Sequence, residues 1–236
     1  MDLKNRIMKT KYNIIFLGLI GLLASCEIDN FDEPQSFLAG SVVYNGTPVQ
    51  VGINEVGFEL WQPGFGKSGA IGVPLNEDGS FSSRLFDGNY KLVFVGGQGP
   101  FRTNVVNAQQ LDTIFVDLKG DTSINIEVTP YFTFNSAQLT VSGNTINASC
   151  QLSKIISDAT VENVTLFINK TQFVSNNNDF NIAQSNSDDV SDITNINASV
   201  EIPELDTTQD YIFARIGVKI AGVEDLLFST AEKITF

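Results

Sequence analysis

Short runs of alternating apolar residues, separated by turn dipeptides, fill the chain after its first 38 residues. Val56-Phe58-Leu60, Tyr90-Leu92-Phe94 and Ile124-Ile126-Val128 are examples, and Asp78-Gly79 is one of the turns between them. A period of two residues is the period of a β-strand with one buried face, whereas a helix repeats every 3.6 residues. No stretch after residue 38 combines a helical period with helix caps. We therefore expect an all-β protein with two β-sandwich domains in tandem.

The expected domains follow from a change of composition. Gly-rich turns become rare after Thr129-Pro130, where Asn, Ser and Thr become common, so the domains are expected at 39–129 and 130–236. Asn176–Asp192 is expected to be a long polar loop. The remaining expected strands are Val49–Ile53, Ile71–Leu75, Ser136–Val141, Thr145–Leu152, Asn163–Ile168, Ala198–Ile202, Tyr211–Ile220 and Leu226–Phe236.

The first 25 residues have the three zones of an export signal. A basic start is followed by the apolar run Ile14–Leu23 and by the small residues Ala24 and Ser25. The apolar run is about half of the roughly 20 residues that span a bilayer, so it is expected to be a cleaved signal peptide. Leu23-Ala24-Ser25-Cys26 resembles the lipobox of bacterial lipoproteins, which implies that Cys26 carries lipid. The alternative is an ordinary signal peptide with a chance cysteine beside the cleavage site.

Residues 26–38 are expected to form a lipidated, acidic tether. Glu27, Asp29, Asp32 and Glu33 lie in it, a composition typical of a solvated spacer. The segment also resembles the acidic signal that follows the lipidated cysteine in Bacteroidota lipoproteins. That resemblance implies a lipid-anchored protein of the outer membrane that faces the cell exterior.

Composition excludes several classes of function. Without residues 1–25 the chain has 10 basic and 26 acidic side chains, a net charge of −16, which disfavours nucleic acid as a partner. The chain has no histidine, so His-based catalysis and His-ligated metals are excluded. Cys150 alternates with Ile146, Ala148 and Leu152, which favours a buried apolar role over a nucleophile. We expect no enzyme activity, no cofactor and no metal site.

Each half of the chain resembles a known kind of sandwich. Gly46–Val49, Asn76–Phe81 and Leu85–Leu92 resemble the signature of transthyretin-like, peptidase-regulatory domains. Asp78-Gly79 is expected to supply the positive φ of a tight hairpin there. The second half resembles a fibronectin type III or Ig-like sandwich, because Leu205 and Tyr211 have the spacing of a tyrosine corner.

One further resemblance covers the whole chain after Cys26, and the residues that carry it are Phe58–Gln62, Leu85–Leu92, Gly99–Phe101 and Val128–Phe132. By these residues the chain resembles the Bacteroidota lipoprotein family known as domain of unknown function 3823. The resemblance implies an outer-surface lipoprotein, usually encoded near a TonB-dependent transporter and its lid lipoprotein for glycan uptake. The family supplies no catalytic or binding residues.

Aromatic residues are the candidate ligand-binding residues. If Phe58 and Leu60 face the core, Trp61 projects from the outer face, where it could stack on a sugar while the Gln62 amide bonds hydroxyl groups. Trp61 could instead pack against a loop or the neighbouring domain. Phe65 and Phe101, both in Gly-rich loops, are either part of a binding platform or loop anchors.

The expected function is therefore non-catalytic. We expect a surface lipoprotein that binds glycan or assists a glycan-uptake complex; the alternative is a structural or adhesion module that contacts only protein partners. Asp188, Asp189 and Asp192 could offer oxygen ligands to calcium, but they lack the spacing of a calcium-binding loop, which favours a solvated loop.

Overall fold

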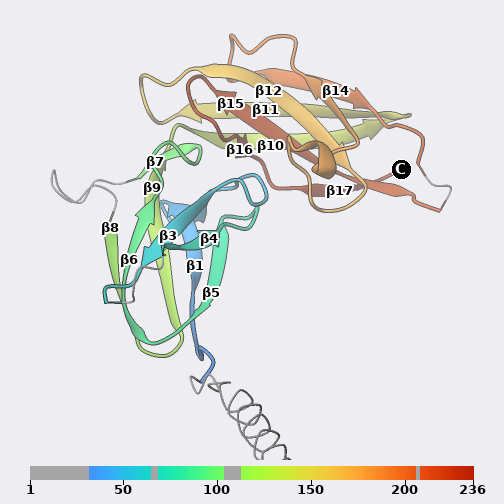
Figure 1. Cartoon of the computed structure of the whole chain (residues 1–236). Helices are drawn as coiled ribbons and strands as arrows, with labels where there is room; N and C mark the ends of the chain where they lie inside the picture. Colours follow the sequence, from blue (N-terminus) through green and yellow to red (C-terminus); the bar gives the residue numbers. More distant parts are fainter. Residues whose placement is uncertain (1–31, 65–68, 104–112, 206–207) are drawn as a thin grey trace, which may run out of the picture. The chain divides into compact units, whose positions relative to one another are not determined.

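The structure is a computed structural model that describes residues 32–64, 69–103, 113–205 and 208–236 (Figure 1). Pro34–Phe236 forms one compact unit. Within the described ranges the regular structure consists of strands and one 3₁₀ turn, Asn178–Phe180, which confirms the all-β fold. The strands are β1 (Ser36–Tyr44), β2 (Thr47–Pro48), β3 (Gly57–Trp61), β4 (Ile71–Pro74), β5 (Ser80–Leu85), β6 (Gly88–Phe94), β7 (Phe101–Thr103), β8 (Thr113–Leu118), β9 (Thr122–Pro130), β10 (Phe132–Ser142), β11 (Thr145–Lys154), β12 (Val161–Asn169), β13 (Ala183–Asn186), β14 (Ile196–Glu201), β15 (Tyr211–Ile220), β16 (Leu227–Phe228) and β17 (Glu232–Thr235).

Strands β1–β9 form the N-terminal sandwich. One sheet has the order β2-β1-β9-β7, with β5 also paired to β1, and the other has the order β4-β3-β6-β8. β1 and β9, the first and last strands, pair in parallel, whereas every other pair here is antiparallel. Parallel pairing joins the two ends of the segment within one sheet.

Strands β10–β17 form the C-terminal sandwich. One sheet has the order β10-β11-β14, and the other has the order β13-β12-β15-β16, with β17 also paired to β15. β12 is buried continuously from Val164 to Asn169, so this strand is covered on both faces. The tyrosine-corner expectation involves residues 206 and 207, which lie outside the described residues. The Tyr211 ring itself packs edge-to-face on Phe213.

A row of edge-to-face aromatic rings fills the N-terminal core. Phe58 packs against Phe81 and Phe94, with ring centroids 4.9 and 5.7 Å apart, and Phe94 packs against Phe101 at 5.6 Å. These four side chains come from both sheets and are at most 5% exposed. Edge-to-face pairs add about 0.5–1.5 kcal/mol each to the free energy of burial, so this row stabilises the contact between the two sheets.

Glycine at position 40 permits the close approach of β1 to β9. A Cβ atom on Gly40 would lie 1.7 Å from the Ile124 carbonyl oxygen. No side chain fits at that distance, so the register of the parallel pair depends on the missing Cβ.

Two of the strand expectations for the N-terminal half are wrong in part. Val49 and Val51 are buried, but the segment Val49–Ile53 is not a strand, because its side chains alternate against the core while its backbone makes only isolated hydrogen bonds. Gly79 has the expected positive φ, 77°, but the turn does not join a hairpin. β4 pairs with β3 and β5 pairs with β1, so the connection crosses from one sheet to the other.

Two expectations for the C-terminal half also differ from the structure. Asn176–Asp192 is not one long loop, because it contains the 3₁₀ turn and β13, which pairs with β12 despite its polar sequence. The expected strand Leu226–Phe236 is interrupted between β16 and β17. Ser229 lies in that interruption, where its carbonyl oxygen accepts a hydrogen bond from Arg215.

Arg215, on β15, links the two sandwiches. Its side chain is fully buried, with Nε donating to the Ser229 carbonyl at 2.6 Å. Nη1 donates to the Val51 carbonyl at 3.0 Å, and Nη2 donates to the Glu77 carbonyl at 2.8 Å. The guanidinium carbon lies 4.4 Å from the centroid of the Phe228 ring. Backbone groups of both sandwiches therefore share one cation.

The charge of Arg215 is retained at neutral pH. Burial lowers the pKa of its guanidinium to about 10, and the Glu77 carboxylate, 3.7 Å away, opposes that shift. Burial also raises the pKa of Glu77 itself. A buried cation that satisfies several carbonyl groups is costly to remove, because its partners are then left unpaired.

We expect Arg215→Ala to lower the free energy of unfolding of the whole chain by about 3–5 kcal/mol. Urea unfolding followed by circular dichroism measures this. Arg102→Ala is the matched control, because Arg102 pairs with Asp158 at 3.0 Å on the surface and should contribute little. Equal losses in the two variants would contradict a special role for the buried arginine.

Candidate functional site

The solvent side of the sheet β4-β3-β6-β8, here called the outer face, carries two exposed aromatic rings. Trp61 at the end of β3 is 45% exposed, and Phe115 on β8 is 60% exposed. Phe58, Leu60 and Val116 alternate with them and are buried. The period of two along β3 and β8 thus places both rings on the side opposite the core.

Strand register puts Lys91 between the two rings. Trp61 is directly opposite Lys91 on β6, and Lys91 is directly opposite Phe115 on β8. Figure 1 shows β6 beside β8. Trp61 and Phe115 are therefore two strand spacings apart, about 9.5 Å. The Lys91 ammonium lies 5.9 Å from the centroid of the Phe115 ring. Trp61, Lys91 and Phe115 form a row across the sheet, which we call the aromatic row.

Polar groups border the aromatic row on both sides. Trp61 Nε1 donates a hydrogen bond of 2.9 Å to Glu59 Oε2, which fixes the indole plane relative to β3. On the other side Asn89 is paired with Asp117 in the β6–β8 register. The two exposed rings of the row, with amides and carboxylates beside them, match a sugar ring, which has an apolar face and hydroxyl groups at its edge.

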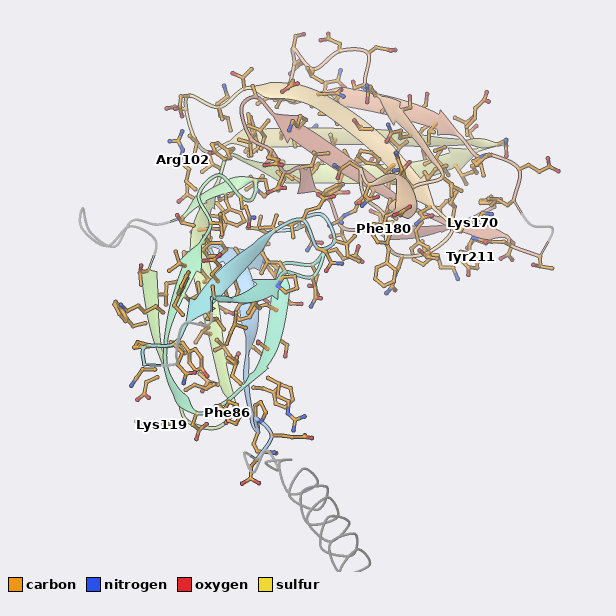
Figure 2. All side chains as sticks on the ribbon, viewed as in Figure 1. Phe86, Arg102, Lys119, Lys170, Phe180 and Tyr211 are labelled. Carbon is orange, nitrogen blue, oxygen red and sulfur yellow. The ribbon has the colours of Figure 1, made fainter. Side chains whose placement is uncertain are left out.

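Lys119 follows β8 and neutralises one of these carboxylates. Lys119 Nζ lies 2.7 Å from Asp117 Oδ2, and this hydrogen bond raises the pKa of Lys119. Figure 2 shows Lys119 close to Phe86 at one end of the N-terminal sandwich. Asp117 is therefore a paired acid at the border of the outer face.

The structure places the four binding candidates in different environments. Trp61 projects outward as expected. Gln62 is half-buried, and its Nε2 lies over the backbone of Gly88, so close that a Cβ there would be 2.6 Å away. Phe65 lies outside the described residues. Phe101 is 4% exposed and belongs to the core, so it is an anchor and is not part of a binding platform.

Phe115 is the residue that the sequence analysis missed. The segment Thr113–Leu118 was not among the expected strands. Its alternation of Phe115 and Asp117 with the apolar Val116 and Leu118 is the signal that could have revealed an outward-facing ring.

The acidic residues that could offer ligands to calcium, and for which the sequence favours a solvated loop, are used in local turns. Asp189 Oδ1 accepts from the Ser191 backbone N–H at 2.7 Å, and Asp192 Oδ1 accepts from the Thr194 hydroxyl at 2.7 Å. These hydrogen bonds lower the pKa of both carboxyl groups. Within the part of the chain that the structure describes, no three His, Cys, Asp or Glu side chains are grouped so that they could hold a metal ion.

Cys150 on β11 is buried, as its sequence pattern predicts. It is 3% exposed, and burial raises the pKa of its thiol to about 11. The thiol is therefore protonated at neutral pH, and neither its charge state nor its position suits a nucleophile.

We expect Cys150 to resist thiol reagents in the folded protein. In a chain that starts at Glu27, Cys150 is the only cysteine. Its reaction with a chromogenic disulfide reagent should be slow at pH 8 and fast after unfolding in urea, because the thiolate forms only near pH 11 in the fold. Fast, stoichiometric labelling of the native protein at pH 8 would contradict a buried thiol.

A groove of about 490 Å³ lies away from the outer face and is one of several cavities in the described residues. Residues of both sandwiches line it, including Tyr44, Phe134, Leu227 and Glu232. Its wall is mainly apolar with a few polar groups, a composition typical of contacts with a protein segment.

Cys26 lies outside the described residues. Among the residues that are described, none belongs to a helix with the length and hydropathy needed to cross a bilayer.

Comparisons with known proteins agree on one family. A model described as "Protein of unknown function (DUF3823) N-terminal domain" matches residues 36–129, and one described as "Domain of unknown function (DUF3823_C)" matches residues 132–233. Among curated proteins, none matches the chain.

Solved structures of three proteins are similar to the chain. A DUF3823 family protein from Parabacteroides merdae is 33% identical, with a TM-score of 0.74 over 86% of this chain and 100% of that one. A DUF3823 family protein from Bacteroides ovatus is 30% identical, with a TM-score of 0.73 over 85% and 99%. A Bacteroides uniformis protein, described as a "putative carbohydrate binding protein", is 17% identical, with a TM-score of 0.64 over 86% and 100%. At that identity, the similarity shows only that the two proteins share a fold.

Proposed function

Because this chain belongs to the DUF3823 family, as its sequence motifs indicated, we propose that it is a non-catalytic surface lipoprotein that binds glycan. The description of the Bacteroides uniformis protein as a "putative carbohydrate binding protein" agrees with this proposal. A role beside a TonB-dependent transporter and its lid lipoprotein is part of the same proposal. It rests on the family resemblance stated above.

The aromatic row is the observation that carries the proposal. Trp61 and Phe115 are large apolar rings held in solvent on a flat sheet, where they stabilise nothing in the core. Exposed rings of this kind suit the apolar faces of sugars, and the neighbouring Glu59, Asn89 and Asp117 suit the hydroxyl groups.

Capture by such a site is weak for a single sugar and strong for a polymer. The outer face is open, so a ligand stays partly hydrated on it, and each stacking contact contributes about 0.5–1.5 kcal/mol beyond area burial. Many copies held on one membrane by lipid at Cys26 would raise retention of a polysaccharide through multivalency.

We expect Trp61→Ala to reduce glycan affinity about tenfold, because stacking on the indole is lost. A polysaccharide and glycan array probed with the soluble chain from Glu27 onward identifies the ligand, and calorimetry measures the change. Phe173→Ala is the control, because Phe173 is an equally exposed ring, 41%, in the C-terminal sandwich. If both variants bind like the unchanged protein, the aromatic row is not the site.

A protein-interaction module is the second candidate function. The groove that includes Tyr44, Phe134 and Leu227 favours it, because its mainly apolar wall is typical of a protein contact. If the protein binds none of the plant, host and microbial glycans on the array, that result would support this candidate over glycan binding. Cross-linking on intact cells would then identify the protein partners.

We expect Cys26→Ser to release the full-length protein from the membrane fraction. Two or three acyl chains anchor a protein almost permanently, at about 0.8 kcal/mol per buried methylene, so their loss should move nearly all of it. Metabolic labelling with an alkynyl fatty acid should mark the unchanged protein and Cys150→Ser, but not Cys26→Ser. Labelling that persists in Cys26→Ser would contradict the lipoprotein assignment.

Protease treatment of intact cells tests whether the protein is exposed at the cell exterior.

A further inference from the structure

We propose that the outer face selects glycans that carry carboxylate groups, such as polyuronates, and that Lys91 is the residue that makes this selection. The inference rests on the proposed glycan-binding function and specifies the class of ligand. It follows from the charges that surround the aromatic row and from the place of Lys91 within it.

Lys91 is the cation at the centre of the aromatic row. It lies directly opposite Trp61 on one side and Phe115 on the other, and its side chain is exposed. Its described contact is with the Phe115 ring, at 5.9 Å. A cation over an exposed ring contributes only about 0.5–1 kcal/mol, so an incoming carboxylate can compete for the ammonium.

The carboxylates beside Lys91 are engaged by other groups. Glu59 accepts the indole N–H of Trp61 at 2.9 Å. Asp117 pairs with Lys119 at 2.7 Å. The strand register places neither directly opposite Lys91. Lys91 is therefore the positive group that a ligand meets between the two rings.

The spacing of the row suits a uronic acid. A sugar stacked on Trp61 or Phe115 extends its substituents toward the next strand, about 4.8 Å away, and that neighbour is Lys91 in both cases. The long, flexible lysine stem lets the ammonium reach a carboxylate at the sugar edge. A neutral sugar stacks on the same rings without this contact.

The overall negative charge of the protein does not prevent this selection. The chain after residue 25 has a net charge of −16, which repels an anionic polymer at long range. At physiological ionic strength, however, exposed charges are screened beyond about 8 Å. The local cation then determines the contact, whereas the net charge slows the approach.

Matched polymers provide the test. Polygalacturonate and alginate are compared with their fully methyl-esterified forms, which keep the backbone and lose the charge. We expect the soluble chain from Glu27 to bind the charged forms at least about threefold more tightly, the range of one exposed ion pair. The difference should shrink in high salt.

Variants then assign the preference to one residue. Lys91→Gln should remove the preference, so that this variant binds the charged and esterified forms equally, and Lys91→Arg should keep the preference. Lys170→Gln removes the same charge from the C-terminal sandwich (Figure 2) and should change nothing, which separates a local contact from net charge.

Three outcomes would overturn the inference, and they are distinguishable. Equal binding of charged and esterified polymers by the unchanged protein would refute carboxylate selection and leave glycan binding intact. Equal weakening of both forms by Lys91→Gln would mean that Lys91 only supports the rings. No binding to any glycan, with the protein folded, would refute the proposed function as well.

Discussion

A buried guanidinium is the cation that the two sandwiches share, and it joins the other hydrogen bonds between them. Moving a charge out of water costs several kcal/mol even after the protein relaxes, and the cost is offset only where the charge finds good partners. Arg215 donates to four backbone carbonyls, those of Val51, Glu77, Val174 and Ser229, which come from segments on both sides of the domain junction. The two sandwiches must meet at these atoms, or the cation is left without its hydrogen bonds.

The same constraint leaves the outer face available for function. The N-terminal partners of Arg215, Val51 and Glu77, lie in connections between strands and not on the sheet β4-β3-β6-β8. These partners of Arg215 therefore lie in loops, while Trp61 and Phe115 on the sheet are exposed. The exposed residues of the outer face are therefore held on strands. Strands position binding groups more precisely than loops do.

Sequence periodicity predicted the fold but only part of the candidate site. The alternation around Trp61 correctly indicated an outward-facing ring, because sheet geometry alone decides that orientation. It failed for Val49–Ile53, where apolar residues alternate without strand pairing. Trp61, Lys91 and Phe115 are neighbours because of the register between strands that are distant in the sequence, and no local sequence pattern encodes that register. The same holds for Arg215. Its buried guanidinium donates to the carbonyls of Val51 and Glu77, which are more than 130 residues away in the sequence.

The parallel pairing of β1 with β9 has a mechanical consequence. Leu38 pairs with Thr122 and Val43 with Glu127, so β1 begins at one end of the sheet and β9 ends at the other. At about 3.3 Å per residue, the chain leaves the N-terminal sandwich roughly 30 Å from where it entered. A pull between the start of β1 and the end of β9 would load the hydrogen bonds between these two strands in shear, all together. Such a strand pair resists tension better than one whose hydrogen bonds open one after another.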